Sequence, residues 1–562
     1  MAKETAEQTD ARFEQLTQLF PQPRRIAECG GLCPQDAPCE EVMAPAVAPE
    51  QGFRLTLSSR KMRIEASDEG GLFYGRQTLA QLRLKAGEAG LACRVIEDWP
   101  DYRHRGYMLD VSRDRVPTMG QLFHLVDQLA VLRYNQLQLY TEHSFAYADH
   151  RTVWENASPI TAAEMRELDA YCRERCIELV PNQNSFGHME RWLCYPGYHH
   201  LAECPGGFAH PLGGWREQGS VLRPEPRSLE FLDGLYGELL PNFTSGRFHI
   251  GGDEPWELGQ GASRERVEAE GKHAVYLDFL SRVCRLAEAH GAAPMCWADV
   301  LLEAPDSIES LPAGVTPVLW GYEADHPFEA QCAVLASLER PFYVAPGDST
   351  WTSHTGRAHT MEANLAAAAA TGLKYGASGY LLTHWGDGGH PQPWVVSIAA
   401  LVRAGLTAWN QDQVAQSLDV AMVAALSESD HPESLAQLLT QAGTLDARLN
   451  CPLPNKSFLA HSLHLEEAAL SAFDPQPTPA ALKEQIEACD ALLGDCRGGD
   501  PLAEELALAL RMNRFAAYRC LGEGHRAPEK PADVVADFRK LWGRRSRRGG
   551  LEQSLARMPG LR

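Results

Sequence analysis

Two adjacent carboxylates, Asp253 and Glu254, are the residues of this 562-residue sequence whose types and spacing best suit chemistry. They end the stretch Arg-Phe-His-Ile-Gly-Gly-Asp-Glu at residues 247–254, in which a short apolar run meets two glycines. The run predicts a strand, and glycine lets the backbone leave a strand in conformations closed to other residues. Paired acids at such a strand end suit a reaction that needs one proton donor and one fixed negative charge.

An Asp-Glu pair after a loop also suits the cap of a helix, which is the simpler structural interpretation. That interpretation leaves His249 and Trp256 unexplained, although both lie in the same short stretch as the acids and the glycines. The combination therefore favours a functional site.

Short β-prone runs alternate with amphipathic helical stretches from residue 105 onward. The elements that they predict must position these acids. The runs are residues 105–112, 135–141, 177–184, 247–254, 294–299, 316–322, 341–347 and 379–387. The clearest helical stretches are residues 118–132, 161–175, 229–240 and 275–290. Eight strands that alternate with helices over about 300 residues predict an α/β fold, the (β/α)8 TIM barrel.

Polar and aromatic residues stand at the carboxyl ends of nearly all of these runs. In chain order they are Asp110 and Arg113, Glu142 and His143, Asn182, Gln183 and Asn184 with Gly187 and His188, Asp253 and Glu254, Trp297 and Asp299, Trp320 and Tyr322, and Trp385 and Asp387. Barrel enzymes build their active sites at the carboxyl ends of their strands, so this pattern predicts a pocket there.

Two further regions flank the barrel, which is expected to take residues 102–408. Residues 1–101 carry alternating runs at 53–57 and 62–66 and then a helical pattern, which predicts a small α+β domain. Residues 409–562 are predicted to form an all-helical C-terminal domain, with helices over 414–426, 432–449, 463–473, 479–493 and 502–521. The insertion at residues 193–222 is rich in Gly, Pro and His and is expected to be a loop over the site.

Composition excludes several classes of protein. A formal net charge of -22 argues against nonspecific binding to nucleic acid or to an anionic membrane. The start of the chain is polar, so no secretory signal is expected. The sequence contains no run of about 18 apolar residues, so no membrane span is expected. Fifteen scattered cysteines predict reduced, mostly buried thiols in a cytoplasmic protein. The cluster of Cys29, Cys33 and Cys39 lacks a fourth ligand, so neither a metal nor another cofactor is expected.

The residues at the strand ends bring a family into view. The stretch from His249 to Glu254 closely resembles the catalytic signature of the family 20 glycoside hydrolases, the β-N-acetylhexosaminidases. The stretch Arg-Gly-Tyr-Met-Leu-Asp at residues 105–110 is similar to that family's first barrel strand, and Gly-Gly-Leu-Phe-Tyr-Gly at 70–75 to the end of its preceding domain. The resemblance covers roughly residues 50–405, and the helical tail loosely resembles a bacterial branch of the family.

The resemblance implies a retaining reaction that uses no protein nucleophile. The 2-acetamido oxygen of the substrate attacks its own anomeric carbon and forms an oxazolinium ion. Glu254 would be the general acid that protonates the leaving oxygen and later activates water. Asp253 would accept the acetamide N–H and stabilise the positive charge on nitrogen. Neighbouring side chains on a strand point in opposite directions, so the two acids can reach different faces of one sugar only where the strand gives way to a loop.

The resemblance also implies a set of substrate-binding residues. Arg105 would hold the 3- and 4-hydroxyls with its fork of donors, although a salt bridge at the base of the barrel is the alternative. Asp387 would accept hydrogen bonds from the 4- or 6-hydroxyl. Aromatic walls and supporting groups would come from Trp297, Trp320, Trp385, His188 and Glu142, and Tyr322, with Trp351 nearby, is the candidate for the acetamide oxygen.

Two strand ends depart from the family pattern. The second strand ends in Glu142 and His143 where the family usually has two aspartates. The third ends in Asn182, Gln183 and Asn184 where the family usually has Glu-Ile-Asp. Both changes remove negative charge near the active acid.

The leading hypothesis is an exo-acting β-N-acetylhexosaminidase that takes an oligosaccharide with a terminal β-linked sugar. The alternatives are a barrel glycosidase in which Asp299 or Asp387 is the nucleophile and a sugar-binding barrel that has lost catalysis. The choice between GlcNAc and GalNAc, the aglycone, and whether the chain forms a homodimer are left open by the sequence.

Overall fold

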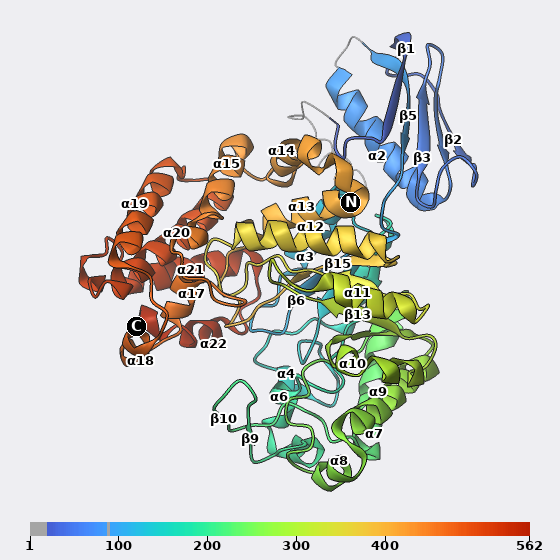
Figure 1. Ribbon diagram of the computed structural model, residues 1–562. Coiled ribbons are helices and arrows are strands. Elements are labelled where there is room, and N and C mark those ends of the chain that lie inside the picture. The colour runs from blue at the N-terminus through green and yellow to red at the C-terminus, as the bar shows by residue number, and fades with distance from the viewer. Residues whose placement is uncertain (1–18, 87–89) are drawn as a thin grey trace.

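The computed structural model describes residues 19–86 and 90–562, and it divides into a small N-terminal sheet domain, a barrel and a helical C-terminal region (Figure 1). The polar start of the chain, on which the expectation about a secretory signal rests, lies outside the described residues. Within the described residues, no helix is both long and apolar enough to cross a membrane.

The eight predicted barrel strands are present, in the predicted order, as one parallel sheet. Neighbouring strands follow the chain order around the barrel, and β15 pairs with β6. The last gap is closed by hydrogen bonds from the His249 amide to the Pro181 carbonyl (2.9 Å) and from the Gln183 amide to the His249 carbonyl (3.0 Å). The strands are β6 (His104–Asp110), β7 (Gln136–Tyr140), β8 (Glu178–Val180), β11 (Arg247–His249), β12 (Ala293–Trp297), β13 (Thr316–Trp320), β14 (Tyr343–Ala345) and β15 (Gly379–His384).

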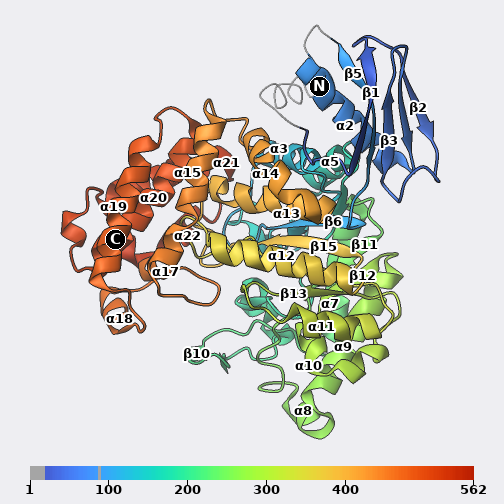
Figure 2. The same ribbon diagram turned by 45° about the horizontal axis from the view of Figure 1, so that its top comes forward.

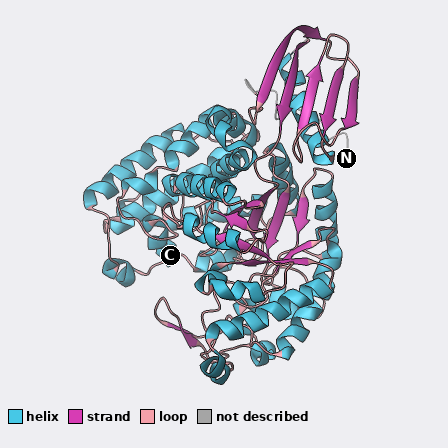
Figure 3. Ribbon diagram, turned by 45° about the vertical axis from the view of Figure 1, so that its right-hand side comes forward, coloured by secondary structure: helices cyan, strands magenta, loops and turns pink. Residues whose placement is uncertain are grey.

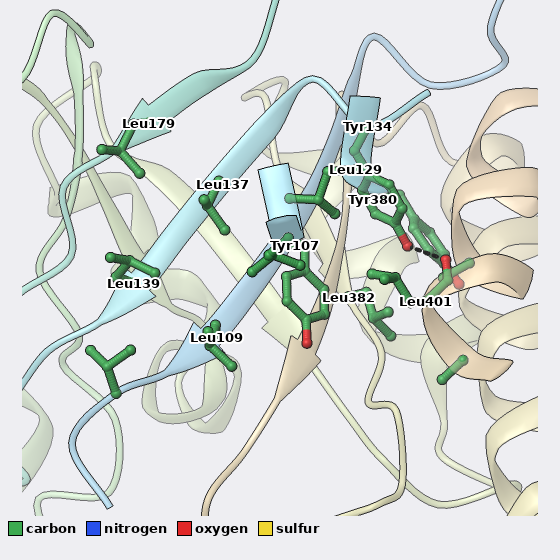
Figure 4. Packing of buried hydrophobic residues seen from close by; sticks show 14 of the residues in the cluster. Tyr107, Leu109, Leu129, Tyr134, Leu137, Leu139, Leu179, Tyr380, Leu382 and Leu401 are labelled. Atoms are coloured by element: carbon green, nitrogen blue, oxygen red, sulfur yellow. Dashed lines mark hydrogen bonds between the residues drawn. The ribbon is translucent and has the colours of Figure 1, made fainter. Parts of the chain in front are cut away.

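Side chains alternate between the two faces of the barrel wall, as the two-residue period of a strand requires. On β6, Tyr107 and Leu109 pack outward against the helices, while Met108 points into the barrel. On β7, Leu137 and Leu139 point outward in the same way. Figure 4 shows this outer layer between the strands and helices, with the Tyr134 hydroxyl donating to the Leu401 carbonyl.

Two of the barrel helices, α3 and α5, begin at side-chain caps. Thr118 accepts a hydrogen bond from the Gln121 amide, and Thr161 forms a capping box with Glu164. Such caps satisfy amide donors that the first turn of a helix leaves unpaired. The helices are α3 (Met119–Val131), α5 (Ala162–Arg173), α7 (Pro226–Leu239), α9 (Lys272–Ala289), α10 (Asp299–Glu303), α11 (Phe328–Ser337), α12 (Ala358–Lys374) and α13 (Ile398–Asn410).

The N-terminal domain is a five-stranded sheet with one helix against it. The strands are β1 (Arg25–Cys33), β2 (Cys39–Met43), β3 (Phe53–Leu57), β4 (Met62–Ala66) and β5 (Leu91–Asp98), in the order β1-β5-β3-β4-β2, and the helix is α2 (Glu69–Ala86). The sequence predicted β3, β4 and α2. It did not predict β1 or β2, because their side chains are mostly exposed and show no apolar alternation.

The C-terminal region is helical, as predicted, and packs along one side of the barrel (Figure 2). Two predicted helices are interrupted: 432–449 is split at Gly443 and Thr444, and 463–473 is split between Leu463 and Glu467. The main helices are α14 (Val414–Ala425), α15 (Pro432–Ala442), α16 (Leu445–Arg448), α17 (Phe458–Leu463), α18 (Glu467–Ala472), α19 (Pro479–Asp495), α20 (Pro501–Cys520), α21 (Pro531–Arg545) and α22 (Leu551–Ala556). The domain boundaries at residues 101 and 408 stay predictions.

This region reaches the carboxyl ends of the barrel strands. Arg557 donates to Asp114 (2.8 Å), which follows β6, and the Asn455 amide donates to Glu323 (2.7 Å), which follows β13. The helical region therefore borders the end of the barrel at which the predicted site lies.

Candidate active site

The turn that carries the two acids depends on its glycines. Gly251 and Gly252 have φ values of 72° and 97°, in the region that side chains with a Cβ rarely adopt. A Cβ on Gly251 would stand 2.0 Å from the Asn184 side-chain oxygen, so both conformation and space require glycine there. The Tyr276 hydroxyl donates to the Gly252 carbonyl (2.7 Å) and fixes the turn. The bend expected from the glycine pair is present.

Asp253 is held as an anion by His188. The His188 Nε2 atom lies 3.1 Å from Asp253 Oδ2 and 3.6 Å from Glu254 Oε2. Burial by itself would raise the pKa of Asp253, but the charge and hydrogen bond of His188 outweigh it and lower that pKa below its ordinary value. The same pairing overcomes burial at His188 and raises its pKa to about 10. Asp253 Oδ1 is buried and accepts no hydrogen bond from any other residue in the described part of the chain.

Glu254 is the more accessible of the two acids, with a side chain 32% exposed against 9% for Asp253. Its φ of 47° turns the side chain away from the strand direction, and its amide donates to Asp299 Oδ2 (3.2 Å). Burial and the neighbouring charge of Asp253 raise the pKa of Glu254, so it keeps its proton to higher pH than an ordinary glutamate. A general acid requires that state.

Arg113 is the cation at this end of β6. Its Nη1 lies 3.0 Å from Asp110 Oδ2, and its Nε lies 3.3 Å from Glu142 Oε1. The guanidinium stacks over the rings of Tyr140 and Trp385, 4.6 and 5.1 Å from their centroids. From the sequence, Arg113 was named only as a strand-end residue and was given no role in binding. The signal that could have found its role is its position three residues after the buried Asp110, beyond the carboxyl end of the strand.

The prediction that Arg105 holds the sugar is wrong. Arg105 is the second residue of β6, at the opposite end of the barrel, and shares the outward face of Tyr107. Its donors are taken by the Arg133 carbonyl (2.7 Å), the Tyr102 carbonyl (2.8 Å) and the Tyr74 hydroxyl (2.7 Å). The alternative was a salt bridge at the base of the barrel. The location is as that alternative had it, but the hydrogen bonds of Arg105 are not a salt bridge, because their acceptors are neutral.

His188 lies beside the acids, whereas Glu142 contacts Arg113 rather than the acids themselves. The Tyr140 hydroxyl donates to Glu142 (3.0 Å), and burial raises the pKa of Glu142 to about 7 although Arg113 opposes the shift. His143, the other departure on this strand, is buried, and burial lowers its pKa to about 3. The substituted strand end thus supplies one carboxylate that supports Arg113 and a neutral imidazole.

The five predicted aromatic residues are brought together inside the carboxyl end of the barrel. The ring of Tyr322 lies 5.1 Å from Trp320, 5.1 Å from Trp351 and 6.4 Å from Trp385, centroid to centroid. Trp385 in turn lies 6.0 Å from Trp297. We call these five residues the aromatic cage. Trp351 follows β14, so residues from four strands build it.

Asp387 lies at the exposed rim of the site, two residues after Trp385. Its negative charge also contributes to the raised pKa of Glu254. Asp299, the other carboxylate near the acids, is partly buried, and burial together with the charge of Asp253 raises its pKa to about 7. Among the described residues, no group of three or more His, Cys, Asp or Glu side chains is arranged to hold a metal ion.

This arrangement offers a proton donor, a fixed anion and an aromatic cage within one barrel end. The anion has one free acceptor atom, and the donor is open to solvent on one side. Such a site suits the acid-assisted cleavage of a bond within a neutral ligand, in a reaction whose transition state develops positive charge on that ligand.

Comparison with known proteins places this site in a family. Residues 102–377 match the model of the catalytic domain of glycosyl hydrolase family 20, and residues 2–99 match that of domain 2 of the same family. The β-hexosaminidase of Akkermansia muciniphila is 27% identical over 272 residues, which cover 44% of this chain and 55% of that protein. The β-hexosaminidase subunit alpha of Bos taurus is 27% identical over 226 residues, 37% of this chain and 41% of that protein.

Solved structures share the fold. The exo β-N-acetylglucosaminidase of Vibrio harveyi has a TM-score of 0.59 at 17% identity and covers 77% of this chain and 78% of its own. The chitobiase of Flavobacterium johnsoniae has a TM-score of 0.58 at 15% identity and covers 96% of this chain and 99% of its own. The chain spans only about half the length of the curated relatives named above.

Proposed function

Since this chain belongs to glycosyl hydrolase family 20, we propose that it removes terminal β-linked N-acetylhexosamine residues by substrate-assisted, retaining catalysis. The observation that carries this proposal is the unsatisfied Oδ1 atom of the buried Asp253. A buried carboxylate oxygen without a partner is costly, and an acetamide N–H of a bound substrate would satisfy it. The aromatic cage supplies apolar walls for the methyl of that group.

In the first step the acetamide oxygen attacks the anomeric carbon while Glu254 donates its proton to the glycosidic oxygen. The bond between that oxygen and the anomeric carbon breaks, the leaving group departs as a neutral alcohol, and an oxazolinium ion remains. Asp253 accepts the N–H and offsets the positive charge that develops on nitrogen. Its lowered pKa keeps it anionic for this task.

In the second step water attacks the anomeric carbon, and Glu254, now a carboxylate, takes the proton of that water. The oxazolinium opens, the acetamide is restored, and both acids return to their starting states. Two inversions at one carbon give net retention.

Arg113 and Asp387 are the residues proposed to hold the outer hydroxyls, with Arg113 in the role that the sequence assigned to Arg105. Arg113 presents a guanidinium at the carboxyl end of β6, beside Trp385. Binding of the outer hydroxyls would close the pocket beyond the terminal sugar, which implies exo cleavage. Tyr322 remains the candidate for the acetamide oxygen, because its ring lies between Trp320 and Trp351 in the cage.

The test is a side-by-side assay of aryl β-GlcNAc, β-GalNAc and β-glucoside, with a thiazoline mimic of the oxazolinium as inhibitor. Hydrolysis confined to the two acetamido sugars and tight thiazoline inhibition would support the proposal. Equal hydrolysis of the glucoside, or trapping by a 2-fluoro glycoside, would instead favour a protein nucleophile. Burial and the neighbouring charge of Asp253 raise the pKa of Asp299, which disfavours the ionised form that a nucleophile needs. A cytoplasmic location and a homodimer stay predictions from the sequence.

A further inference from the structure

Three buried side chains behind the aromatic cage form a continuous hydrogen-bonded network that the proposed reaction does not use. The His384 Nδ1 atom lies 2.5 Å from Asp348 Oδ2, and the His384 Nε2 atom lies 2.8 Å from His390 Nε2. The exposed fractions of the three residues are between 1% and 4%. Polar groups buried this deeply are costly unless they are paired, so their joint presence calls for a physical reason. We call Asp348, His384 and His390 the Asp-His-His network.

The network lies on the helix-facing side of the barrel wall. His384 ends β15 and shares the outward face of Tyr380 and Leu382, between the strands and the surrounding layer of helices that Figure 3 shows. Its ring lies 6.0 Å from that of Trp394, centroid to centroid, and Trp394 packs against the same outer core. The next residue, Trp385, points the other way into the aromatic cage, because side chains alternate along a strand. The network therefore stands directly behind the cage.

At one end of the network, Asp348 organises the turn that carries Trp351. Asp348 Oδ1 accepts hydrogen bonds from the amide (3.0 Å) and the hydroxyl (2.9 Å) of Thr350. The Asp348 amide donates to the Thr383 carbonyl (3.0 Å), which fastens the turn to the end of β15. Imidazole is a stronger base than a carboxylate, so the proton between Asp348 and His384 belongs to His384 Nδ1. Asp348 is then an anion that accepts hydrogen bonds at both oxygens.

At the other end, His390 fixes the turn that presents Asp387. The His390 amide donates to the Gly386 carbonyl (2.7 Å), so residues 386–390 form one tight turn around Asp387. His390 has a φ of 55°, which residues with a Cβ rarely adopt. Such a conformation persists only where the surrounding structure holds it in place. Within the described part of the chain, the side chain of His390 has one hydrogen bond, the one to His384, since its Nδ1 has no partner.

The hydrogen bonds assign one proton to each histidine. With its proton on Nδ1 toward Asp348, a neutral His384 presents a bare Nε2, so His390 must donate from its own Nε2. The Nδ1 atom of His390 is then bare, and a bare nitrogen is less costly to bury without a partner than an N–H group. Burial and the nearby His384 and Arg115 lower the pKa of His390 well below its ordinary value, which favours the same neutral form.

We propose that the Asp-His-His network is a positioning device for the reaction, which holds the turns of Trp351 and Asp387 in the places where the sugar binds. The inference rests on the proposed function, because that function gives Asp387 a hydroxyl of the sugar to hold. The three residues are positioning residues, since they lie behind the barrel wall and act through the two turns. The acids follow a different strand, β11, so the network should govern recognition of that hydroxyl rather than proton transfer.

The test compares the kcat/KM of an aryl β-HexNAc glycoside with those of its 4-deoxy and 6-deoxy analogues. In the unaltered enzyme, loss of the hydroxyl that Asp387 holds should lower kcat/KM at least about tenfold. In His390→Phe, which fills the same space without the donor, this deoxy cost should shrink to less than about threefold, because the complete substrate has already lost the contact. His390→Gln should keep the full cost, since its amide nitrogen still donates to His384.

Asp348→Asn tests the proton assignment, and Tyr380→Phe is the matched control. The Thr350 amide requires the asparagine oxygen, so the NH₂ group would face His384 and oppose its Nδ1 proton. This variant should therefore reduce the deoxy cost as His390→Phe does. Tyr380→Phe removes a buried hydrogen bond to the Leu365 carbonyl (3.1 Å) on the same face of β15. It should lower the melting temperature and leave the deoxy cost unchanged.

Nitrogen NMR of the histidine-labelled enzyme gives a measurement that does not depend on activity, because ring nitrogens with and without a proton have different chemical shifts. At neutral pH it should show both histidines uncharged, with the proton of His384 on Nδ1 and that of His390 on Nε2. A charged His390, or either proton on the other nitrogen, would overturn the proposal.

Three kinetic outcomes would also overturn it. The deoxy cost could stay the same in His390→Phe, the Tyr380→Phe control could reduce it equally, or neither hydroxyl could matter in the unaltered enzyme. An enzyme that hydrolyses no acetamido sugar at all would instead contradict the proposed function, and the NMR spectrum would still test the network.

Discussion

Two arginines on either side of the first barrel strand show what the two ends of this barrel do. Arg105 is the second residue of β6, and its guanidinium donates only to neutral oxygens. It lies 5.4 Å from the centroid of the Tyr74 ring and 5.1 Å from that of the Trp409 ring. Arg113 follows β6 and lies between two carboxylates and two aromatic rings of the active site. One residue type therefore has two roles. Arg105 joins the small domain to the barrel at one end of the strand, and Arg113 lies at the site at the other end.

The difference teaches that a residue's place along a parallel strand matters more than its type. In barrels the carboxyl ends carry chemistry, and features at the amino ends serve stability. Arg105 fastens α2 of the small domain to the barrel through Tyr74, whereas Arg113 has part of its side chain open to a ligand, at 19% exposure. Mutations at the two ends should separate activity from stability.

The largest effect should come from Glu254→Gln, which removes the proton donor and keeps the shape. For substrates with poor leaving groups, kcat should fall by about 10²–10⁴. Aryl glycosides with acidic phenols should lose less, because their leaving oxygen needs less help. A leaving-group series of aryl glycosides measures this, and equal losses across the series would argue against Glu254 as the acid.

Asp253→Asn should follow, with kcat lowered by about 10²–10³ while KM stays within a few-fold. The physical reason is that the positive charge on nitrogen develops mainly in the transition state, so ground-state binding loses little. Affinity for the thiazoline inhibitor should weaken sharply in the same variant. If kcat or inhibitor affinity survives, substrate-assisted catalysis through Asp253 is wrong.

Arg113→Lys should lower kcat/KM by about 10–100-fold, since hydrogen bonds to a charged group contribute about 1.5–3 kcal/mol and lysine lacks the planar fork. The melting temperature should change little, because a cation remains beside Asp110 and Glu142. Steady-state kinetics on one aryl glycoside and a thermal melt are sufficient. Unchanged kinetics would contradict a role for Arg113 in substrate binding.

Arg105→Lys is the matched substitution at the other end of β6. It should lower the free energy of unfolding by about 1.5–3 kcal/mol, because lysine cannot reach all the acceptors and leaves buried carbonyls unpaired. The kcat/KM of the folded fraction should match that of the unaltered enzyme. Urea unfolding and active-site titration test this, and a kinetic defect without loss of stability would reverse the comparison.

The smallest effect at neutral pH concerns His188→Gln. His188 lowers the pKa of Asp253, so the unaltered enzyme keeps Asp253 anionic as pH falls through the ordinary range. Without the imidazolium that pKa should rise by roughly one to three units, and the acidic limb of the kcat profile should move to higher pH by the same amount. A limb that stays in place would show that His188 does not hold the charge of Asp253.

Much of the site followed from sequence because four of the five cage residues, Trp297, Trp320, Tyr322 and Trp385, stand at strand ends that local pattern identifies. The prediction for Arg105 was wrong because it relied on the resemblance to a family motif and ignored the two-residue period of the strand, which decides the face on which a side chain lies. Tyr107 and Leu109 were visibly apolar and belonged to the helix-facing side, and Arg105 shares their parity. The hairpin of β9 (Phe208–Ala209) and β10 (Trp215–Arg216), within the predicted loop over the site, was not predicted, since its strands are only two residues long.

The sequence by itself determined the barrel, the glycine turn and the pair of acids, because strand and helix periods and φ-permissive glycines act locally. Only the tertiary structure decided which arginine lies at the carboxyl end of the barrel and how His188 holds Asp253 as an anion beside the more accessible Glu254. Those properties depend on side chains from distant strands meeting in one buried space, where distance and burial set each charge.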